Sequence, residues 1–296
     1  MPLPAGAMRA PLMMVASGFC FAVMAALVKL SSESGVPFSQ VVFYRGLVAF
    51  LLAWLVLRWQ GLPLISTHWR AQAVRGMIGI VGVFCYTAGV VLLPIASAVT
   101  LNYTSPLLLA GVLLVQARQA PSWPLVVALA AGFLGVVLLL QPHFSAGQWV
   151  GIAAALTSAL TAVAAALHIR TLARLKESAW RTVAWFSGSV ALAALPGYLG
   201  TDPTALSLRG AGLVLAMGLA GALGQALLTL AYQRGHALTV SLLGYSQVVF
   251  TTVLGILWWE DHPVLGTWIG IALIVGSGAL ATTFLGRLSV GKPPRS

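Results

Sequence analysis

Apolar residues fill ten long stretches of the chain, and short polar, glycine or proline breaks separate them. A helix needs roughly 20 apolar residues to cross about 30 Å of hydrocarbon. The pattern therefore predicts ten membrane-spanning helices, at residues 10–30, 38–58, 71–93, 95–116, 121–140, 147–170, 180–199, 209–232, 237–258 and 264–286. We expect an all-α polytopic membrane protein. Its short connections leave no room for a soluble domain, so a binding site must lie within the bundle.

The second half of the chain repeats the first, about 142 residues further on. Tyr103 recurs as Tyr245, and Pro121 recurs as Pro263. Three glycines recur in register, so that Gly76, Gly79 and Gly82 match Gly218, Gly221 and Gly224. We predict one five-helix repeat at 10–141, a second at 147–286, and short tails at 1–9 and 287–296. Because five is odd, the second repeat lies inverted in the membrane, an arrangement typical of secondary transporters.

Composition agrees with a lipid environment. The 296 residues are 59% hydrophobic and 7% charged, and the mean hydropathy is +0.96. The net charge of +11 does not indicate nucleic-acid binding, because the basic residues are scattered singly. We therefore expect the lipid bilayer and a small molecule as partners, with no nucleic acid, and a monomer.

The basic residues also predict the orientation. Of 16 Lys and Arg residues, thirteen, including Arg75, fall on the side of the N-terminus and two on the other side, while Arg45 lies within a span. Loops rich in Lys and Arg stay in the cytoplasm. We expect a multi-pass protein of a bacterial-type inner membrane, with both termini cytoplasmic.

Several short motifs resemble the drug/metabolite transporter superfamily, EamA type. They are Phe43-Tyr44-Arg45-Gly46, Asn102-Tyr103-Thr104-Ser105-Pro106 and Trp259-Glu260. The family usually closes the fourth span with an acid, where this chain has Arg118. The resemblance implies a ten-helix transporter with a central cavity lined by spans one, three, four, six, eight and nine.

Polar groups near the predicted mid-depth are candidate substrate contacts. They are Asn102, Tyr103, Tyr245, Gln247, Tyr86, Gln225 and Arg45. A buried polar group without a partner is costly in hydrocarbon, so these groups bond one another or face water. The alternative role is structural hydrogen bonding between helices. For Arg45, the alternative is a side chain that reaches the outer surface and bonds backbone carbonyls there.

A second set of residues is expected to act in gating or packing. The two glycine stripes allow close helix contact, and they serve either static packing or sliding between the two halves. Pro106 frees a backbone carbonyl near Asn102. His168 is a candidate gate group or a hydrogen-bonded residue near the cytoplasmic end of its span.

Residue patterns that the sequence lacks reduce the number of possible function classes. The sequence shows no catalytic constellation and no metal-ligand spacing, so we expect a protein that is not an enzyme and has no cofactor. The five carboxylates lie in loops or at span ends, which favours gradient-driven transport over proton coupling. We predict an alternating-access carrier of a small polar or amphipathic metabolite, most simply an exporter of amino acids or related compounds. The alternatives are an importer of a vitamin, sugar or nucleoside-like compound, and a passive channel or lipid-handling protein.

Overall fold

The computed structural model describes residues 9–118, 120, 122–200, 208–259 and 264–285. Within them every regular element is a helix, and ten helical spans are long and apolar enough to cross a membrane. The elements are α1 (Arg9–Glu33), α2 (Phe38–Trp59), α3 (Trp69–Leu92), α4 (Ile95–Asn102), α5 (Ser105–Ala117), α6 (Trp123–Leu140), α7 (Trp149–Arg174), α8 (Ala179–Leu199), α9 (Leu208–Arg234), α10 (Ala237–Leu243), α11 (Ser246–Trp259) and α12 (Leu265–Leu280), followed by a π-helix, η1 (Ala281–Leu285). The predicted tails, apart from Arg9, and the residues Asp202, Glu260 and Asp261 lie outside the described residues.

The predicted fourth and ninth spans are each divided in two, which corrects the expectation of continuous helices at 95–116 and 237–258. The first break separates α4 from α5 at Tyr103, and the second separates α10 from α11 at Tyr245. Pro106 contributes to the first break because it sits in the opening turn of α5 and has no N–H to donate backwards. The two breaks fall at positions that correspond in the repeat.

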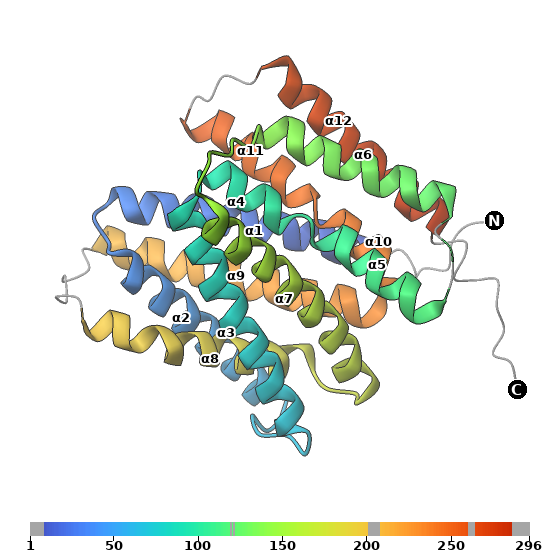
Figure 1. Cartoon of the computed structure of the whole chain (residues 1–296). Coiled ribbons are helices and arrows are strands. Elements are labelled where there is room, and N and C mark those ends of the chain that lie inside the picture. The colour runs from blue at the N-terminus through green and yellow to red at the C-terminus, as the bar shows by residue number, and fades with distance from the viewer. Residues whose placement is uncertain (1–8, 119, 121, 201–207, 260–263, 286–296) are drawn as a thin grey trace, which may run out of the picture.

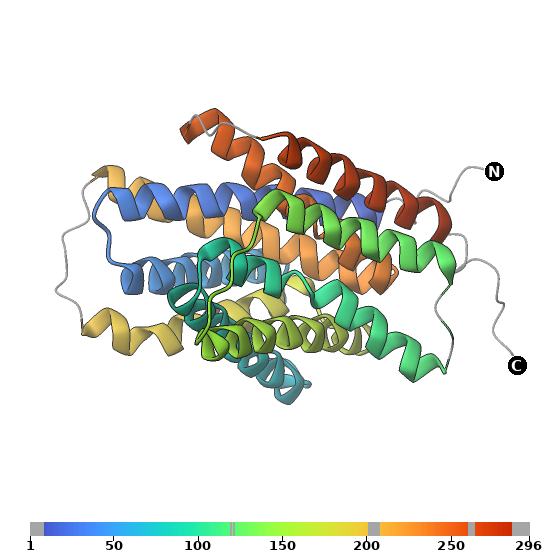
Figure 2. The same cartoon turned by 45° about the horizontal axis from the view of Figure 1, so that its top comes forward.

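Helix packing follows the repeat. α1 packs along α9, and the helices that correspond to them in the repeat, α7 and α3, pack in the same way. α2 pairs with α8 at one edge of the bundle, and α6 pairs with α12 at the opposite edge (Figures 1 and 2). Since α1 begins and α12 ends at the same end of the bundle, we call that end the terminal face.

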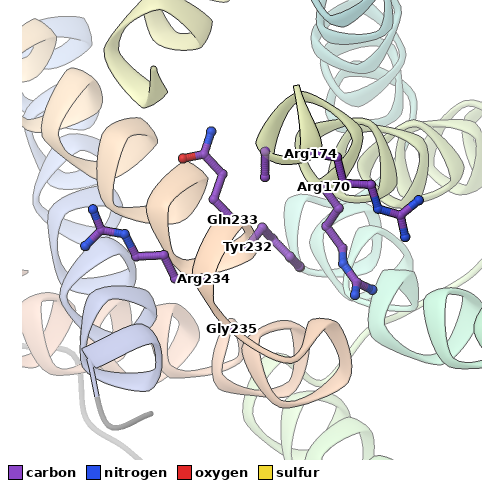
Figure 3. A pocket seen from close by; sticks show the side chains of 7 residues that line it. Arg170, Arg174, Tyr232, Gln233, Arg234 and Gly235 are labelled. Carbon is purple, nitrogen blue, oxygen red and sulfur yellow. The ribbon is translucent and has the colours of Figure 1, made fainter. Parts of the chain in front are cut away.

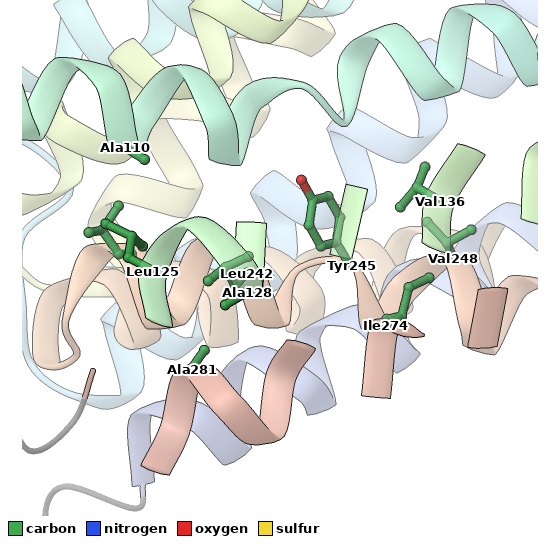
Figure 4. Packing of buried hydrophobic residues seen from close by; sticks show 10 residues of the cluster. Ala110, Leu125, Ala128, Val136, Leu242, Tyr245, Val248, Ile274 and Ala281 are labelled. Atoms are coloured by element: carbon green, nitrogen blue, oxygen red, sulfur yellow. The ribbon is translucent and has the colours of Figure 1, made fainter. Parts of the chain in front are cut away.

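Small residues let paired helices approach closely. A Cβ added at Gly135 of α6 would lie 2.7 Å from the carbonyl oxygen of Gly270 of α12, and the reverse distance is the same. Beside this contact, residues of α5, α6, α10, α11 and α12 form a buried apolar cluster around Tyr245 (Figure 4). Tryptophans stand at the first or last position of several helices, among them Trp59, Trp69, Trp123 and Trp149, as expected at membrane interfaces.

Candidate substrate site

A cavity of about 140 Å³ lies midway along the bundle, between α1, α2, α3, α8 and α9. It is lined by Phe21, Met24, Arg45, Gly46, Ala49, Val83, Phe186, Ser187, Val190, Gly221 and Gln225. The cavity combines one guanidinium, one amide and one hydroxyl with two aromatic rings. Such a mixture of apolar surface and few polar groups is typical of small-molecule sites.

Two repeat-related pairs of residues meet in this cavity. Arg45 and Ser187 are 142 positions apart, and so are Val83 and Gln225, the same separation that relates Tyr103 to Tyr245. Because corresponding residues of both halves line one space, the cavity lies where the two repeats meet. Secondary transporters with inverted repeats bind their substrates at this place.

Arg45 and Gln225, both predicted substrate contacts, are therefore brought together. Arg45 lies seven residues into α2 and makes no hydrogen bond or ion pair within the described part of the chain. Gln225 lies on α9, one turn beyond Gly221. Neither side chain makes a hydrogen bond to another helix within the described part of the chain, which leaves both groups available to a ligand.

Tyr86 extends this polar region along α3 and faces the interior. The exposed residues Met77, Val81 and Phe84 mark the outer side of α3. Tyr86 is two residues beyond Phe84, so it points to nearly the opposite side of the helix. It is nevertheless 38% exposed and lies near Arg45. Its exposed surface therefore opens to space inside the bundle.

Asn102, Tyr103 and Tyr245 form a separate group at the helix breaks. The Tyr245 hydroxyl donates a 3.1 Å hydrogen bond to the Tyr103 backbone carbonyl. The Asn102 amide donates a 2.7 Å bond to the hydroxyl of Ser158 in α7. Tyr103 also lies near Tyr86, which connects this group with the neighbourhood of the cavity.

Gln247 is not among the residues that line the cavity. It is in the first turn of α11, where its backbone packs against Gly18 of α1. The observed cavity is thus lined by spans one, two, three, seven and eight, whereas the family resemblance implied a lining that included spans four, six and nine. A role in substrate contact for Asn102, Tyr103, Tyr245 and Gln247 stays a prediction.

The two glycine stripes make matching contacts. On α3, Gly76 and Gly79 face α8, and Gly82 faces Thr161 of α7. On α9, Gly218 faces Val48 of α2, while Gly221 and Gly224 face Met24 and Phe21 of α1. Both stripes therefore lie at contacts between the two repeats. Static packing and sliding between the halves would both require this position. Pro106 is buried at the α4–α5 break, and the His168 ring bonds the Ala71 carbonyl of α3 at 2.8 Å.

A polar cluster at the terminal face was not predicted. Glu177, 6% exposed, lies between α7 and α8. Its carboxylate accepts hydrogen bonds from Arg181 at 2.7 Å and Gln72 at 3.1 Å, and it contacts the His68 ring at 3.1 Å. The Gln233 side chain of α9 donates to the Glu177 backbone carbonyl. The cluster thus ties α3, α8 and α9 together, and the only signal in the sequence was the Glu177–Arg181 spacing at the start of a helix.

A second pocket, of about 260 Å³, opens beside this cluster between the ends of α7 and α9. It is lined by Arg170, Arg174, Tyr232, Gln233 and Arg234, among others. Figure 3 shows that the arginine side chains of α7 and α9 extend in different directions and do not converge on one point. The pocket fits an arginine-rich membrane interface better than a shaped substrate site.

Arg75 also differs from its sequence assignment as a loop charge. It lies within α3, is 4% exposed, and stacks on the Phe186 ring with 4.6 Å from guanidinium carbon to ring centroid. The sequence places Arg75 near a span end but does not reveal which face of α3 packs inward. The structure thus adds a second arginine next to the cavity wall.

Ten spanning helices around a polar cavity, with matching halves, define a polytopic membrane protein of the transporter type. A family model described as the EamA-like transporter family matches residues 8–141 and again residues 145–283. The chain belongs to this family.

Similar proteins agree with this class. The pseudopaline exporter CntI of Pseudomonas aeruginosa is 31% identical over 268 residues, which cover 89% of this chain and 92% of that protein. A riboflavin transporter of Rhizobium johnstonii is 30% identical, with 93% and 91% covered. A solved crystal structure with 23% identity has a TM-score of 0.78 and covers 94% of this chain and 98% of its own; this likeness shows the fold. Two different cargoes among the relatives leave the substrate open.

Proposed function

We propose that this transporter is an alternating-access carrier that exports a small polar or amphipathic metabolite, such as an amino acid or a related compound. It works as a monomer in a bacterial inner membrane, with the bilayer and a small-molecule substrate as its partners. It binds no nucleic acid and catalyses no reaction. Both termini are cytoplasmic in this proposal, which makes the terminal face the cytoplasmic face.

The observation that supports the proposal most directly is the pairing of Arg45 with Ser187 and of Val83 with Gln225 around one cavity. A site at the meeting of two inverted halves stays in place while the halves rock about it. The glycine contacts between the halves offer surfaces on which such movement can occur. Similarity to an exporter supports export as the direction of transport.

Counterflow in proteoliposomes tests the mechanism. Vesicles with the purified protein are loaded with an unlabelled amino acid and placed in a trace of the same labelled compound. A carrier accumulates label inside the vesicle transiently. Each unlabelled molecule that leaves exposes the binding site to the outside, where the site binds a labelled molecule and carries it inward. A channel lets the label equilibrate without an overshoot. Absence of an overshoot for every amino acid and for riboflavin would refute the carrier proposal in this form.

Orientation is tested separately with cysteine reporters. With Cys20 and Cys85 replaced by serine, single cysteines are introduced at Ser34, between α1 and α2, and at Gln60, at the end of α2, which lie at opposite faces of the bundle. In intact cells, a membrane-impermeant maleimide should label the cysteine at 34 and spare the one at 60. Labelling of the cysteine at 60 but not of the one at 34 would refute the assignment of the terminal face to the cytoplasm.

An importer of a vitamin-like compound is the second candidate, favoured by the similarity to a riboflavin transporter. A carrier whose cavity contains no mid-depth carboxylate among the described residues runs in whichever direction its gradient dictates. Transport assays in both vesicle orientations, with riboflavin and amino acids compared, separate the two candidates.

A further inference from the structure

One guanidinium group lines the mid-bundle cavity and a second lies behind an aromatic residue of its lining, and neither has an anionic partner among the described residues. Arg45 lines the cavity and makes no hydrogen bond or ion pair with the residues that the structure describes. Arg75 lies behind Phe186, and its Nε and Nη1 atoms are buried without a hydrogen-bond partner. Phe186 itself lines the cavity, so Arg75 stacks on a ring that forms part of the cavity wall.

The carboxylates among the described residues are engaged elsewhere. Glu33, at the end of α1 away from the terminal face, accepts a 3.1 Å bond from the Trp259 indole. Glu177 is held by Arg181 at the terminal face. An uncompensated arginine within a membrane span is costly, and such residues usually mark a site for a counter-ion or substrate. Stacking on Phe186 offsets part of this cost for Arg75, while Arg45 stacks on no aromatic ring among the described residues.

We infer that the cavity binds an organic carboxylate, and that the Arg45 guanidinium receives the carboxylate group. The planar guanidinium matches a carboxylate with two parallel hydrogen bonds. Gln225 and Ser187 supply neutral hydrogen bonds around it, and Phe21 and Phe186 cover the apolar part of the molecule. The inference rests on the proposed carrier function, to which it adds the charge of the cargo.

Arg75 places a second positive charge beside this site. It lies on the same face of α3 as Gly79 and Tyr86, four and eleven residues further along, and nearer to the terminal face. Its charge adds to that of Arg45 in favouring an anion in the cavity.

The first test measures stability without any ligand. Arg45→Gln removes an unpaired charge, so the purified variant should have a higher Tm than the wild type. The matched control is Arg181→Gln, which breaks the ion pair with Glu177 and should lower Tm. If Arg45→Gln lowers Tm as well, Arg45 is a structural residue and the inference fails.

The second test uses two molecules of nearly equal shape and different charge. Benzoate should raise the Tm of the wild-type protein, whereas benzamide at the same concentration should not, because a bound ligand stabilises the folded state. Arg45→Gln should weaken benzoate binding about 10- to 100-fold, and Arg45→Lys should retain part of it. Equal shifts with both compounds, no shift with benzoate, or an equal shift with inorganic phosphate would overturn the assignment.

Transport assays separate this inference from the function on which it rests. Counterflow of neutral compounds without any effect of carboxylates would leave the carrier function intact and refute the anion site. Binding of benzoate that depends on Arg45, without counterflow of any carboxylate, would support the anion site and refute the carrier function. Counterflow of a carboxylate that is lost in Arg45→Gln and partly kept in Arg45→Lys supports both.

Discussion

The Tyr245 hydroxyl donates a hydrogen bond of 3.1 Å to the backbone carbonyl of Tyr103, the residue that corresponds to it in the other repeat. Each tyrosine stands where its span is broken into two helices. The bond therefore joins the two breaks directly and connects one half of the transporter with the other. The two rings also lie 5.9 Å apart between centroids.

Replacing Tyr245 by Phe removes this bond and keeps the ring in its apolar cluster. We expect a loss of about 1–2 kcal/mol in the free energy of unfolding, because the Tyr103 carbonyl loses its partner. Tyr103→Phe is the matched control, since it deletes a hydroxyl from the same pair and leaves the backbone acceptor in place. Thermal unfolding of both variants in detergent measures the difference. Equal losses would show that the hydrogen bond contributes nothing measurable.

Gly79 and Gly221 correspond in the repeat but have different neighbours. A Cβ at Gly79 would collide with the Phe186 ring, whereas one at Gly221 would meet the flexible end of Met24 at 3.0 Å. We expect Gly79→Ala to cost about 1–3 kcal/mol and Gly221→Ala less than about 1 kcal/mol. Because Phe186 lines the cavity, Gly79→Ala should also slow transport more than its counterpart does.

The glycine comparison needs a control for the intrinsic effect of alanine in a helix. Gly111 in α5 and Gly276 in α12 have open space around an added Cβ. Alanine at either position should leave transport unchanged and leave stability unchanged or slightly higher. If Gly79→Ala matches these two variants in transport rate and in Tm, the contact between position 79 and the Phe186 ring affects neither transport nor stability.

Asn102 distinguishes a substrate contact from a structural tie. Its amide bonds the Ser158 hydroxyl at 2.7 Å, so either Asn102→Ala or Ser158→Ala breaks the same link between α4 and α7. We expect similar losses of stability, about 1 kcal/mol each, and a markedly larger rise in the transport KM for Asn102→Ala. Identical KM values for the two variants would assign Asn102 to structure alone.

The sequence predicts the repeat, the ten spans and the mid-depth polar residues, because these follow from hydropathy and spacing. It does not reveal the break at Tyr245, since Gly244 differs little from other glycines within spans. For a related reason, the sequence alone indicates only ordinary charges near loops at Arg75 and Glu177. Whether such a side chain faces lipid headgroups or the bundle interior depends on the rotation of the helix and on its neighbours, which only the packed structure provides. Arg45 and Gln225 line one cavity, and their role as substrate contacts stays a prediction.

The Glu177 cluster makes stability depend on pH. Burial favours the neutral carboxyl, but hydrogen bonds from Arg181, Ser66, Gln72 and His68 outweigh this effect and hold the pKa of Glu177 below its usual value. A lowered pKa stabilises the folded protein at pH above the unfolded value of about 4.3. That contribution is lost as the pH falls through the lower, folded value. We therefore expect the Tm of the wild-type protein to fall in this acidic range.

Glu177→Gln provides the comparison, because its side chain has a similar shape and does not titrate. It leaves Arg181 buried without its anion, so the variant should be less stable than the wild type near pH 7, by about 3 kcal/mol. As the pH is lowered below about 4, the wild type should lose stability faster than the variant, and the two curves should converge. Parallel curves over the whole range would show that other carboxylates cause the acid sensitivity and that the Glu177 cluster is not the tie between α3, α8 and α9 that its contacts indicate.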